Sequence, residues 1–556
     1  YPPLYRPLAR RNHEVGGEKA STPDPRDARL GDIYHSSPQA VGPPRIDIAD
    51  ESYNLFRQLP QVANRPTVLY VGTNDGILHA FVVEDFTNPI TGQTYRAGEE
   101  LWGFIPPILV EKLEAATTSH QIMLDGTPVI RDVFYRRLPG DTPDGTIYHT
   151  VLLMGFRAGA PGYFALDVTD PVNPVFLWQY VGEIPRGRSG RGTPFGYAYG
   201  SPALGQVLVD IRGTLPERAI ALLPGGSGEV DEALRRTTGP IGCPAQGIGQ
   251  PPVTDGTTNA RSRQRCWATT GRALSWIDIV TGEVISTFDS STFNAPLTGG
   301  VALAPGDVGQ VAERAFFTDA DGVMWAADFS ARRTSDWTVR PFHDIFWDSA
   351  ATVGQPAYNP PIITSDAEGQ FVVVQATGDI DRLDAREANR VVSLTEQATY
   401  SAAGRPSYRT ALNWEIRLRA GEQVTGALEL FESSVYFASF ESNADTTNAC
   451  ELGVSRIWAV DYLDAGATPP SGYVDVAGGR ITQRPTCLSG AEEMDPYIGA
   501  RYRVGEVTTG QFVWTAQLSG GVADPLTTGA IRTVEETLPM PQSFTTLQSF
   551  AGAVDY

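Results

Sequence analysis

A short unit of two β-strands joined by a Gly/Asp turn recurs along the chain and constrains its fold more than any other feature. In each copy, one strand ends in a tight turn, and the next strand alternates apolar and small residues before it ends in Asp or an equivalent. Turns of this composition join antiparallel strands into hairpins. The copies are VLYVGTNDGILHAFVVED (68–85), VLLMGFRAGAPGYFALDVTDP (151–171), RALSWIDIVTGEVISTF (272–288), RAFFTDADGVMWAADFS (314–330), FVVVQATGDIDRLDA (371–385) and SRIWAVDYLDAG (455–466).

The unit predicts many short strands and little helix. The best helical pattern is Ile108–Ala116, a short amphipathic stretch after two prolines, which are tolerated at a helix start. Turn residues bound nearly every predicted strand. The predicted strands are Thr67–Gly72, Leu78–Val83, Thr150–Met154, Gly162–Asp167, Ala219–Leu223, Ala273–Ile279, Arg314–Thr318, Gly322–Phe329, Gln370–Gln375, Ser434–Phe440 and Arg456–Asp461.

Repetition of a β-hairpin favours a radial architecture. A single four-stranded blade cannot bury its own faces, whereas blades packed around an axis bury both faces and leave only short outer edges. We therefore expect an all-β, quinoprotein-like β-propeller of about seven blades, with inserted loops and short helices. A pair of packed β-sandwiches is the alternative.

The irregular spacing of the units indicates insertions in one large domain. We expect residues 1–29 to form an extended lead-in and residues 30–520 to form the propeller, followed by a tail of uncertain role at 521–556. Gly- and Arg-rich or polar insertions are expected at 182–199 and 225–265, since long loops of this kind are uncommon unless functional or disordered. The chain starts at Tyr1, so we expect a processed form or part of a longer protein.

The charge balance excludes some partners. The chain has 64 Asp and Glu against 43 Lys and Arg, for a formal net charge of -21. An acidic surface repels phosphate backbones, so nucleic acid is a poor partner. No stretch approaches the roughly 18 apolar residues that a membrane span requires.

The four cysteines are Cys243, Cys266, Cys450 and Cys487, and none forms a Cys-x-x-Cys pair. Zinc and thioredoxin chemistry are therefore disfavoured. An even count with loop-like neighbours indicates two disulfides and an oxidising compartment. Sequence order favours Cys243–Cys266 and Cys450–Cys487 among the three possible connectivities.

Motifs in a fixed order resemble the C-terminal propeller region of the PilY-type type IV pilus assembly factors and tip adhesins. Quinoprotein dehydrogenase blades share the Gly turn, so a single motif is weak evidence, but the ordered set across about 30–462 is specific. The matching segments are LGDIYHSSPQAVGPP (30–44), VLYVGTNDGILHAF (68–81), GEELWGFIP (98–106), DGTP (125–128), ALDVTDP (165–171), ALSWIDIVTG (273–282), TDADGVMWAADF (318–329), ATG (376–378), the stretch 421–450 ending in SNADTTNAC, and SRIWAVD (455–461).

The resemblance also implies a calcium loop with the EF-hand-like pattern Asp-x-Asp-x-Asp-Gly-x-x-Asp. Two ligand positions keep acids, Asp307 and Glu313, while two others fall on Pro305 and Gly309. Calcium takes six to eight oxygen ligands, mostly carboxylates, so we predict that binding here is weak or lost. A shifted register using Asp319 and Asp321 is the less favoured alternative, because Asp-Ala-Asp-Gly is an ordinary hairpin turn. No cofactor is otherwise expected.

The sequence does not support catalysis. A quinone-dependent dehydrogenase, the enzyme alternative, often uses a disulfide of adjacent cysteines, which this chain lacks. Its stacking candidates, Trp102, Trp178, Trp276 and Trp325, lie in strand-like runs typical of core. The six histidines form no His-x-x-x-His or Glu-x-x-His pair, and we expect His79 to be a satisfied hairpin residue. Strand-end acids are expected to accept backbone N–H bonds in turns: Asp32, Asp167, Asp278, Asp328 and Asp461.

The segment RGRSGR at 186–191 is a local basic stretch on an acidic chain. Arg186, Arg188 and Arg191 are the candidates for contact with an acidic partner; a mobile solvated loop is the alternative. The resemblance implies a non-catalytic pilus biogenesis factor and tip-associated adhesin. It would dock on minor pilins, promote assembly or oppose retraction, and contact host or abiotic surfaces. It would act outside the cell, at the pilus tip or outer membrane, after export through the periplasm. A cell-surface binding propeller unrelated to pili is a further alternative.

Overall fold

The computed structural model describes most of the propeller region and parts of the chain after it. The described residues are 30–45, 50–88, 91–116, 118–135, 148–181, 195–210, 217–229, 267–305, 311–346, 354–379, 388–400, 406–431, 433–442, 453–465, 481–483, 500–508, 511–519 and 531–539. No helix among these residues is long and apolar enough to cross a membrane.

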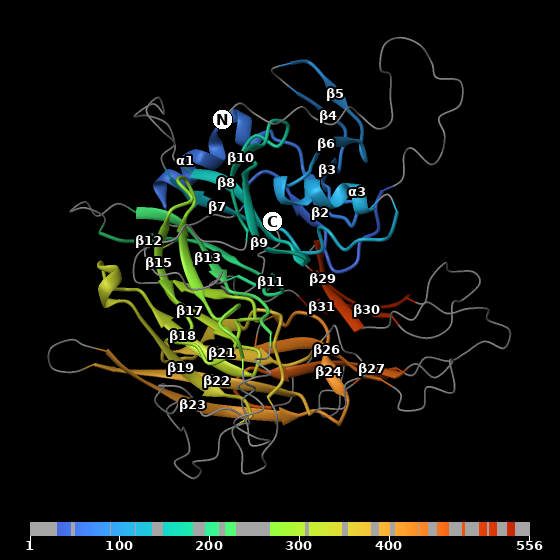
Figure 1. Ribbon diagram of the computed structural model, residues 1–556. Coiled ribbons are helices and arrows are strands. Elements are labelled where there is room, and N and C mark those ends of the chain that lie inside the picture. The colour runs from blue at the N-terminus through green and yellow to red at the C-terminus, as the bar shows by residue number, and fades with distance from the viewer. Residues whose placement is uncertain are drawn as a thin grey trace, which may run out of the picture.

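Six antiparallel sheets follow one another along the chain, each with four main strands in sequence order, and we call them blades 1 to 6 (Figure 1). Blade 1 contains β1 (Gln39–Val41), β2 (Val68–Gly72), β3 (Leu78–Val82) and β6 (Glu100–Phe104). Blade 2 contains β7 (Val129–Phe134), β8 (Tyr148–Gly155), β9 (Arg157–Asp167) and β10 (Val175–Val181). Blade 3 contains β12 (Ala203–Leu208), β13 (Glu217–Pro224), β14 (Leu274–Asp278) and β15 (Val284–Phe288).

The second half of the propeller repeats this plan. Blade 4 contains β16 (Ala302–Pro305), β17 (Ala312–Thr318), β18 (Val323–Asp328) and β19 (Thr338–Asp344). Blade 5 contains β20 (Ile362–Ser365), β21 (Phe371–Ala376), β22 (Arg390–Tyr400) and β23 (Pro406–Arg417), and blade 6 contains β24 (Glu422–Val424), β26 (Ser434–Ser442), β27 (Gly453–Asp461) and β28 (Ile481–Gln483).

A smaller sheet follows blade 6. It contains β29 (Ala500–Thr508), β30 (Gln511–Ser519) and β31 (Ile531–Pro539), and β29 and β30 contact β26 and β27. Its role as a further blade, and so the total of about seven, stays a prediction. Short strands complete the β structure: β4 (Phe86–Thr87) pairs with β5 (Thr94–Tyr95), β11 (Tyr197–Ala198) with β9, and β25 (Glu429–Phe431) with β26.

The first strand of each blade lies nearest the axis. β1 contacts β7, β7 contacts β12, β12 contacts β16, and β16 contacts β20, so these strands are the inner strands. The hydrophobic cores lie between neighbouring blades. On β8, for example, Leu152 and Met154 pack in the core between blades 1 and 2, while Val151 and Leu153 pack in the core between blades 2 and 3. A middle strand therefore needs apolar residues on both faces.

Helices are few and short. The predicted helix at Ile108–Ala116 is a 3-10 helix, η1 (Pro107–Lys112), followed by one α-helical turn, α3 (Leu113–Ala116). The sequence analysis missed α1 (Glu51–Gln58), which is followed by α2 (Pro60–Ala63). Asp50 caps α1 by accepting a hydrogen bond from the Tyr53 N–H at 3.1 Å, as preferred N-cap residues do.

The outer strand carries a β-bulge in each of the first five blades. Its pairing with the third strand shifts register once, which places one extra residue on the outer strand. A bulge twists an exposed edge and disrupts its hydrogen-bond ladder, which blocks pairing with another chain. The extra residues are Leu101, Leu177, Ile285, Phe342 and Asn413.

Tryptophans on three outer strands fasten a blade to the next one. The indole N–H groups of Trp102, Trp178 and Trp414 donate to backbone carbonyls of Pro171, Ile279 and Asp461, at 2.7, 3.0 and 3.0 Å. Each acceptor belongs to the turn that follows the third strand of the next blade, or to its last residue. The bond satisfies a buried indole N–H and fixes the angle between the two blades.

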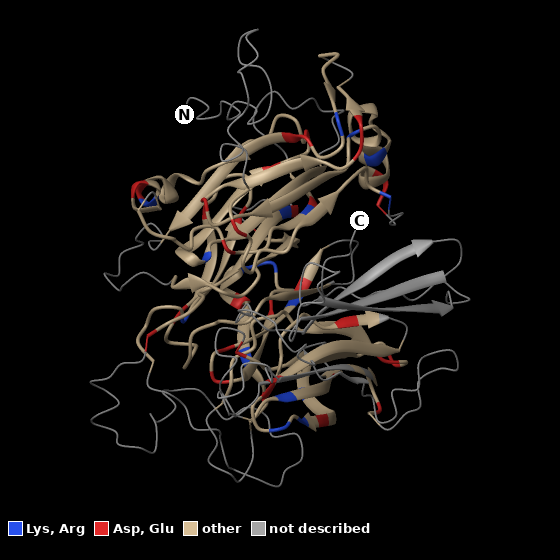
Figure 2. Cartoon of the chain, turned by 90° about the vertical axis from the view of Figure 1, so that its right-hand side faces the viewer, with Lys and Arg blue, Asp and Glu red and all other residues tan. Residues whose placement is uncertain are grey.

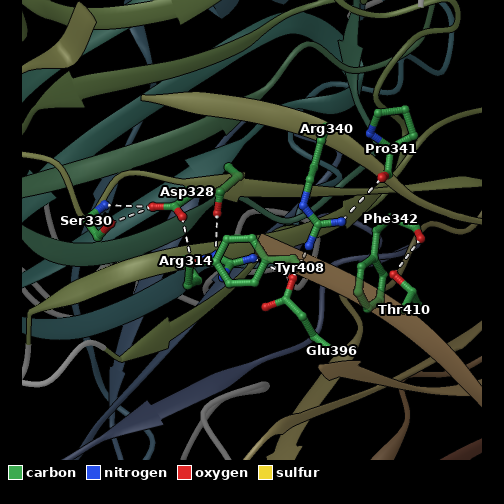
Figure 3. Close-up of polar contacts among 10 residues, drawn as sticks. Arg314, Asp328, Ser330, Arg340, Pro341, Phe342, Glu396, Tyr408 and Thr410 are labelled. Atoms are coloured by element: carbon green, nitrogen blue, oxygen red, sulfur yellow. Dashed lines mark hydrogen bonds and ion pairs between the residues drawn. The ribbon is translucent and has the colours of Figure 1, made fainter. Parts of the chain in front are cut away.

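The junction between blades 4 and 5 uses charges instead (Figure 3). Glu396 on β22, whose side chain is 2% exposed, accepts hydrogen bonds from Arg314 on β17, at 2.5 Å, and from Arg340 on β19. Tyr408 on β23 donates to Asp328 at 2.8 Å, and the Arg314 guanidinium lies 4.1 Å from the centre of its ring. We call these five residues the charged junction.

Aspartates at strand ends shape turns, as predicted for four of the five. Their carboxylates accept the backbone N–H two residues later, at 2.8 to 3.1 Å. Asp32 differs: its carboxylate accepts hydrogen bonds from the side chains of Asn74 and His120, which belong to segments far away in the sequence. The four confirmed turn residues are Asp167, Asp278, Asp328 and Asp461.

Candidate functional site

One end of the propeller gathers the connections most suited to binding. Because neighbouring strands are antiparallel, the turns between second and third strands lie at the same end as the connections from each outer strand to the next inner strand. We call this end the loop face. The connections that contain 182–194, 230–266, 347–353, 380–387 and 443–452, all outside the described residues, belong to it by strand order.

Backbone hydrogen bonds join the described parts of the loop face into one platform. The Ser227 N–H donates to the Tyr197 carbonyl at 2.8 Å, and the Gly226 N–H donates to Leu297 at 3.0 Å. In the next blades, Ala320 donates to Pro296 and Gly378 donates to Pro356, at 2.8 and 2.9 Å. Because these bonds cross from blade to blade, the face is held as a unit.

An arginine in an unusual conformation lies near the axis at this face. Arg157, the first residue of β9, has a φ of 49° and is buried. A non-glycine residue in this region is held there by its surroundings, and such strain concentrates at functional positions. Arg157 is therefore the first residue to consider when a site is sought on this face.

Four residues from four blades lie around Arg157, and together with Arg157 we call them the axial cluster. The Arg157 Nε atom lies 3.2 Å from the Asp125 carboxylate, whose other contact is with His35 at 2.8 Å. The guanidinium lies 5.0 and 5.8 Å from the ring centres of Tyr199 and Tyr358, within cation–π range. Apart from Arg157, which belongs to β9, each member precedes the inner strand of a different blade: blade 1, 2, 3 or 5. Their contact therefore spans the axis.

The axial cluster is packed rather than open. The Tyr199 and Tyr358 rings lie 5.4 Å apart, and the Tyr358 hydroxyl donates to Asp379 at 3.2 Å. The Asp379 N–H in turn donates to Gln423 of blade 6 at 2.8 Å. Aromatic and charged side chains therefore occupy the axial end of the propeller, where a dehydrogenase-like propeller needs room for its quinone.

The predicted partner and disulfide residues lie outside the described residues. This holds for Arg186, Arg188 and Arg191 and for all four cysteines, Cys243, Cys266, Cys450 and Cys487. The basic stretch lies in the connection between β10 and β11, which belongs to the loop face. Cys243 and Cys266 lie between β13 and β14, whose described ends meet where the Ala268 N–H donates to the Glu229 carbonyl at 2.8 Å.

Of the two predicted calcium positions, the structure describes only Glu313, in blade 4. Asp307 is outside the described residues, and Glu313 is a half-buried residue of β17 whose carbonyl accepts from the Phe329 N–H. The connection between β16 and β17 lies at the end opposite the loop face. Weak or absent calcium binding there stays a prediction. No group of three or more His, Cys, Asp or Glu among the described residues is arranged to hold a metal ion.

The alternative pair, Asp319 and Asp321, forms a hairpin turn. Asp319 accepts hydrogen bonds from the backbone N–H groups of Asp321 and Val323, at 2.9 and 3.0 Å, and from the Trp325 indole at 2.9 Å. Asp321 accepts from the Trp267 indole at 2.9 Å. Burial and the neighbouring Asp321 carboxylate raise the pKa of Asp319 to about 8. Both Asp319 oxygens and Oδ2 of Asp321 are committed to turn and indole contacts.

One group resembles a catalytic triad in its order of atoms. His79 lies 3.2 Å from the Thr73 hydroxyl through Nε2 and 2.7 Å from Glu100 through Nδ1. Thr73 is fully buried, at 0% exposure, and the acceptors within reach of its single hydroxyl hydrogen are Asp75 and the Ile77 carbonyl. A nucleophile must reach its substrate, so this group is a structural hydrogen-bond network, as expected of a hairpin histidine.

The tryptophans considered for quinone stacking are core residues, as predicted. Trp102, Trp178, Trp276 and Trp325 are all at most 7% exposed and belong to the cores between blades. Sequence reasoning missed Arg157, Tyr199 and Tyr358. Asp125 was noted only within the DGTP motif. No local pattern distinguishes an arginine that must adopt positive φ, since its partners come from other blades.

The fold and this face define a β-propeller with one elaborated loop face. In the comparison with protein families, the family described as "PilY1 beta-propeller domain" matches residues 30–211. The Type IV pilus biogenesis factor PilY1 of Pseudomonas aeruginosa strain PAO1 is 36% identical over 167 residues, which covers 28% of this chain and 12% of that protein. A PilY1 homolog of Xylella fastidiosa is 34% identical over 163 residues, with 28% and 12% covered.

The comparison with solved structures gives the fold over nearly the whole chain. The C-terminal domain of Pseudomonas aeruginosa PilY1 matches with a TM-score of 0.53 at 17% identity, covering 90% of this chain and 99% of that one. The aligned region is a small part of the length of the curated relatives. The chain therefore has a β-propeller fold like that of this domain, and its residues 30–211 are similar to the PilY1 propeller family, as the ordered motifs predicted.

Proposed function

We propose that this chain acts in type IV pilus biogenesis as a non-catalytic docking propeller. The observation that carries the proposal is the match of residues 30–211 to the PilY1 propeller family, with curated relatives named as type IV pilus biogenesis factors. The packed axial cluster and the buried tryptophans also favour docking over quinone chemistry.

The loop face is the proposed contact surface. Its backbone bonds between blades provide a rigid base, and loops on rigid scaffolds are common sites of recognition. We assign the partner contact to Arg186, Arg188 and Arg191, whose positive charges suit an acidic surface. The partners are minor pilins at the pilus tip, outside the cell. Docking there would promote assembly or oppose retraction, and the same face would contact surfaces.

The first test is co-purification with the minor pilins of the same organism. A stable co-eluting complex at micromolar protein supports the proposal. Arg186→Glu with Arg188→Glu should weaken the complex at least tenfold and make it less sensitive to salt. The matched control is Arg332→Glu with Arg333→Glu, the same charge change in the turn between β18 and β19 at the opposite end.

The second test is made in cells. Removing the propeller from its gene should abolish or sharply reduce surface pili, and expression of the intact gene should restore them. Normal piliation together with no pilin complex would overturn the proposal and favour a binding propeller unrelated to pili. A quinone absorbance band in the purified protein would instead support the dehydrogenase alternative.

A further inference from the structure

The segment that leads into blade 1 lies across the loop face as a strap, residues 30–38. It carries three exposed apolar side chains, Leu30, Ile33 and Tyr34, at 45, 42 and 38% exposure. Neutral bonds hold it at several points. The Asn74 N–H donates to the Asp32 carbonyl at 2.9 Å, and the Gly72 N–H donates to the Ser36 hydroxyl at 3.0 Å.

Three of the six histidines lie at this strap, although they are far apart in the sequence. His35 contacts Asp125 at 2.8 Å at one end of the strap. His120 contacts Asp32 of the strap at 3.0 Å. His79 lies beside the turn that the strap contacts, 2.7 Å from Glu100 and 3.7 Å from Asp75.

The strap and the turn beneath it both carry a carboxylate. Gly31 lies so close to Asp75 that an added Cβ would be 2.7 Å from the Asp75 carboxyl carbon. The next residue, Asp32, carries its own carboxylate. Burial alone would raise the pKa of Asp32, but hydrogen bonds from Asn74 and His120 lower it, so Asp32 stays charged. Like charges at such a contact repel unless a cation compensates them.

His79 supplies that cation at the buried side. Its side chain is 1% exposed and faces Glu100 from β6 and Asp75 from the turn. Burial by itself would lower the pKa of His79, but its contacts with Asp75 and Glu100 raise it above the ordinary 6.5. At the far end, Arg157 compensates Asp125 at 3.2 Å whether or not His35 is charged.

We propose that residues 30–38 form a pH-sensitive strap, held on blade 1 while His79 is protonated and loosened when it is neutral. Loss of this proton leaves Asp75, which Gly31 of the strap contacts, and Glu100 without the compensating charge of the imidazole. A raised His pKa means that stabilisation is full below pH 6.5 and is lost as the pH rises through the higher value. The strap is therefore held in place on blade 1 under mildly acidic conditions.

Hydrogen exchange measured by mass spectrometry tests the strap directly. Protection of 30–38 and 70–76, corrected for intrinsic exchange rates, should fall about 3- to 10-fold between pH 6 and pH 9. The backbone N–H groups of His35, Ser37, Gly72 and Asn74 are the reporters, because each bonds across the contact. Strap protection that does not change with pH would overturn the proposal.

Two variants and one control separate the charge effect from folding. His79→Gln keeps hydrogen-bonding capacity without charge, so protection should be low and nearly independent of pH. Glu100→Gln removes one acid that favours the imidazolium, so the transition should move to lower pH by about half to one unit. His149→Gln breaks a His–Asp contact outside the strap, with Asp167, and should leave the strap profile unchanged. An unmoved transition in Glu100→Gln would overturn the proposal even if His79→Gln fails to fold.

Discussion

The junction between blades 1 and 2 and the junction between blades 4 and 5 solve the same packing problem with opposite chemistry. In blade 1, Trp102 lies opposite Ala80 of the third strand and donates to Pro171 of blade 2. In blade 4, the residue opposite the corresponding Ala326 is Arg340, which reaches Glu396 of blade 5. The same register position therefore holds either a tryptophan whose indole N–H donates to the next blade, which we call an indole latch, or an arginine in an ion pair.

The difference matters because the indole hydrogen bond and the charged junction respond differently to pH and salt. An indole–carbonyl hydrogen bond carries no charge and is insensitive to pH and salt. The charged junction has desolvated two guanidinium groups and a carboxylate, and its stability depends on keeping all three together. Burial lowers the pKa of Arg340, and the neighbouring Glu396 opposes that shift. Removal of the Glu396 charge therefore leaves the desolvation of the Arg340 guanidinium uncompensated.

The largest expected effect comes from Glu396→Gln. Arg314, which is buried, and Arg340, which is half-buried, lose their counter-charge, so the free energy of unfolding should fall by about 3–5 kcal/mol. Urea unfolding followed by tryptophan fluorescence measures the loss. Glu368→Gln, an exposed acid in the turn before β21, is the matched control and should change stability by less than about 0.5 kcal/mol. A loss below 1 kcal/mol would contradict the charged-junction argument.

Asp167→Asn alters the turn that accepts the indole hydrogen bond between blades 1 and 2, because Asp167 shapes the turn that contains Pro171. Burial alone would raise the pKa of Asp167, but His149 and Thr169 lower it to about 2. Relative to the ordinary aspartate pKa of 3.8, this shift contributes about 2 kcal/mol, present above pH 4 and lost as pH falls through 2. The variant should lose that amount at pH 7 and show a flatter acid limb in unfolding experiments at pH 2–5. An unchanged acid limb would refute this role.

Trp178→Phe removes the latch between blades 2 and 3 while keeping an aromatic ring in the core. We expect a loss of about 1–2 kcal/mol, from the indole hydrogen bond and the smaller volume. Since no charge is involved, the loss should be the same at low and at 1 M salt. A strong salt dependence of the loss would erase the distinction between the two kinds of junction.

The smallest effect is expected for Asp321→Asn in the loop-face turn of blade 4. Asp319 has a pKa of about 8 in the folded protein, above its ordinary 3.8, so its contribution is full below pH 3.8 and lost as the pH rises to 8. Neutralising Asp321 removes a negative charge that helps to raise the pKa of Asp319. The variant should be more stable than the parent at pH 8 by about 0.5–1 kcal/mol and by less at pH 5, measured by thermal unfolding. Equal shifts at both pH values would contradict it.

The strands that the sequence revealed are the middle strands of the blades. The predicted strands match β2, β3, β8, β9, β13, β14, β17, β18, β21, β26 and β27. These strands face a core on both sides, so they read as nearly continuous apolar runs. β22, a middle strand of blade 5, was missed as well. The inner and outer strands were missed because they are short, as β1 is, or partly exposed, as β15 and β23 are, and lack that signal.

The sequence by itself determined the hairpin repeat, its Asp turns and the likeness to PilY-type propellers, because these depend on neighbours within about twenty residues. The tertiary structure alone decided that Arg340 replaces a tryptophan latch, that Arg157 meets Tyr199 and Tyr358, and that Gly31 lies against Asp75, a neighbour of His79. Those contacts join residues from different blades or distant segments. Radial packing brings them together, and no periodic pattern along the chain records which partner each side chain meets.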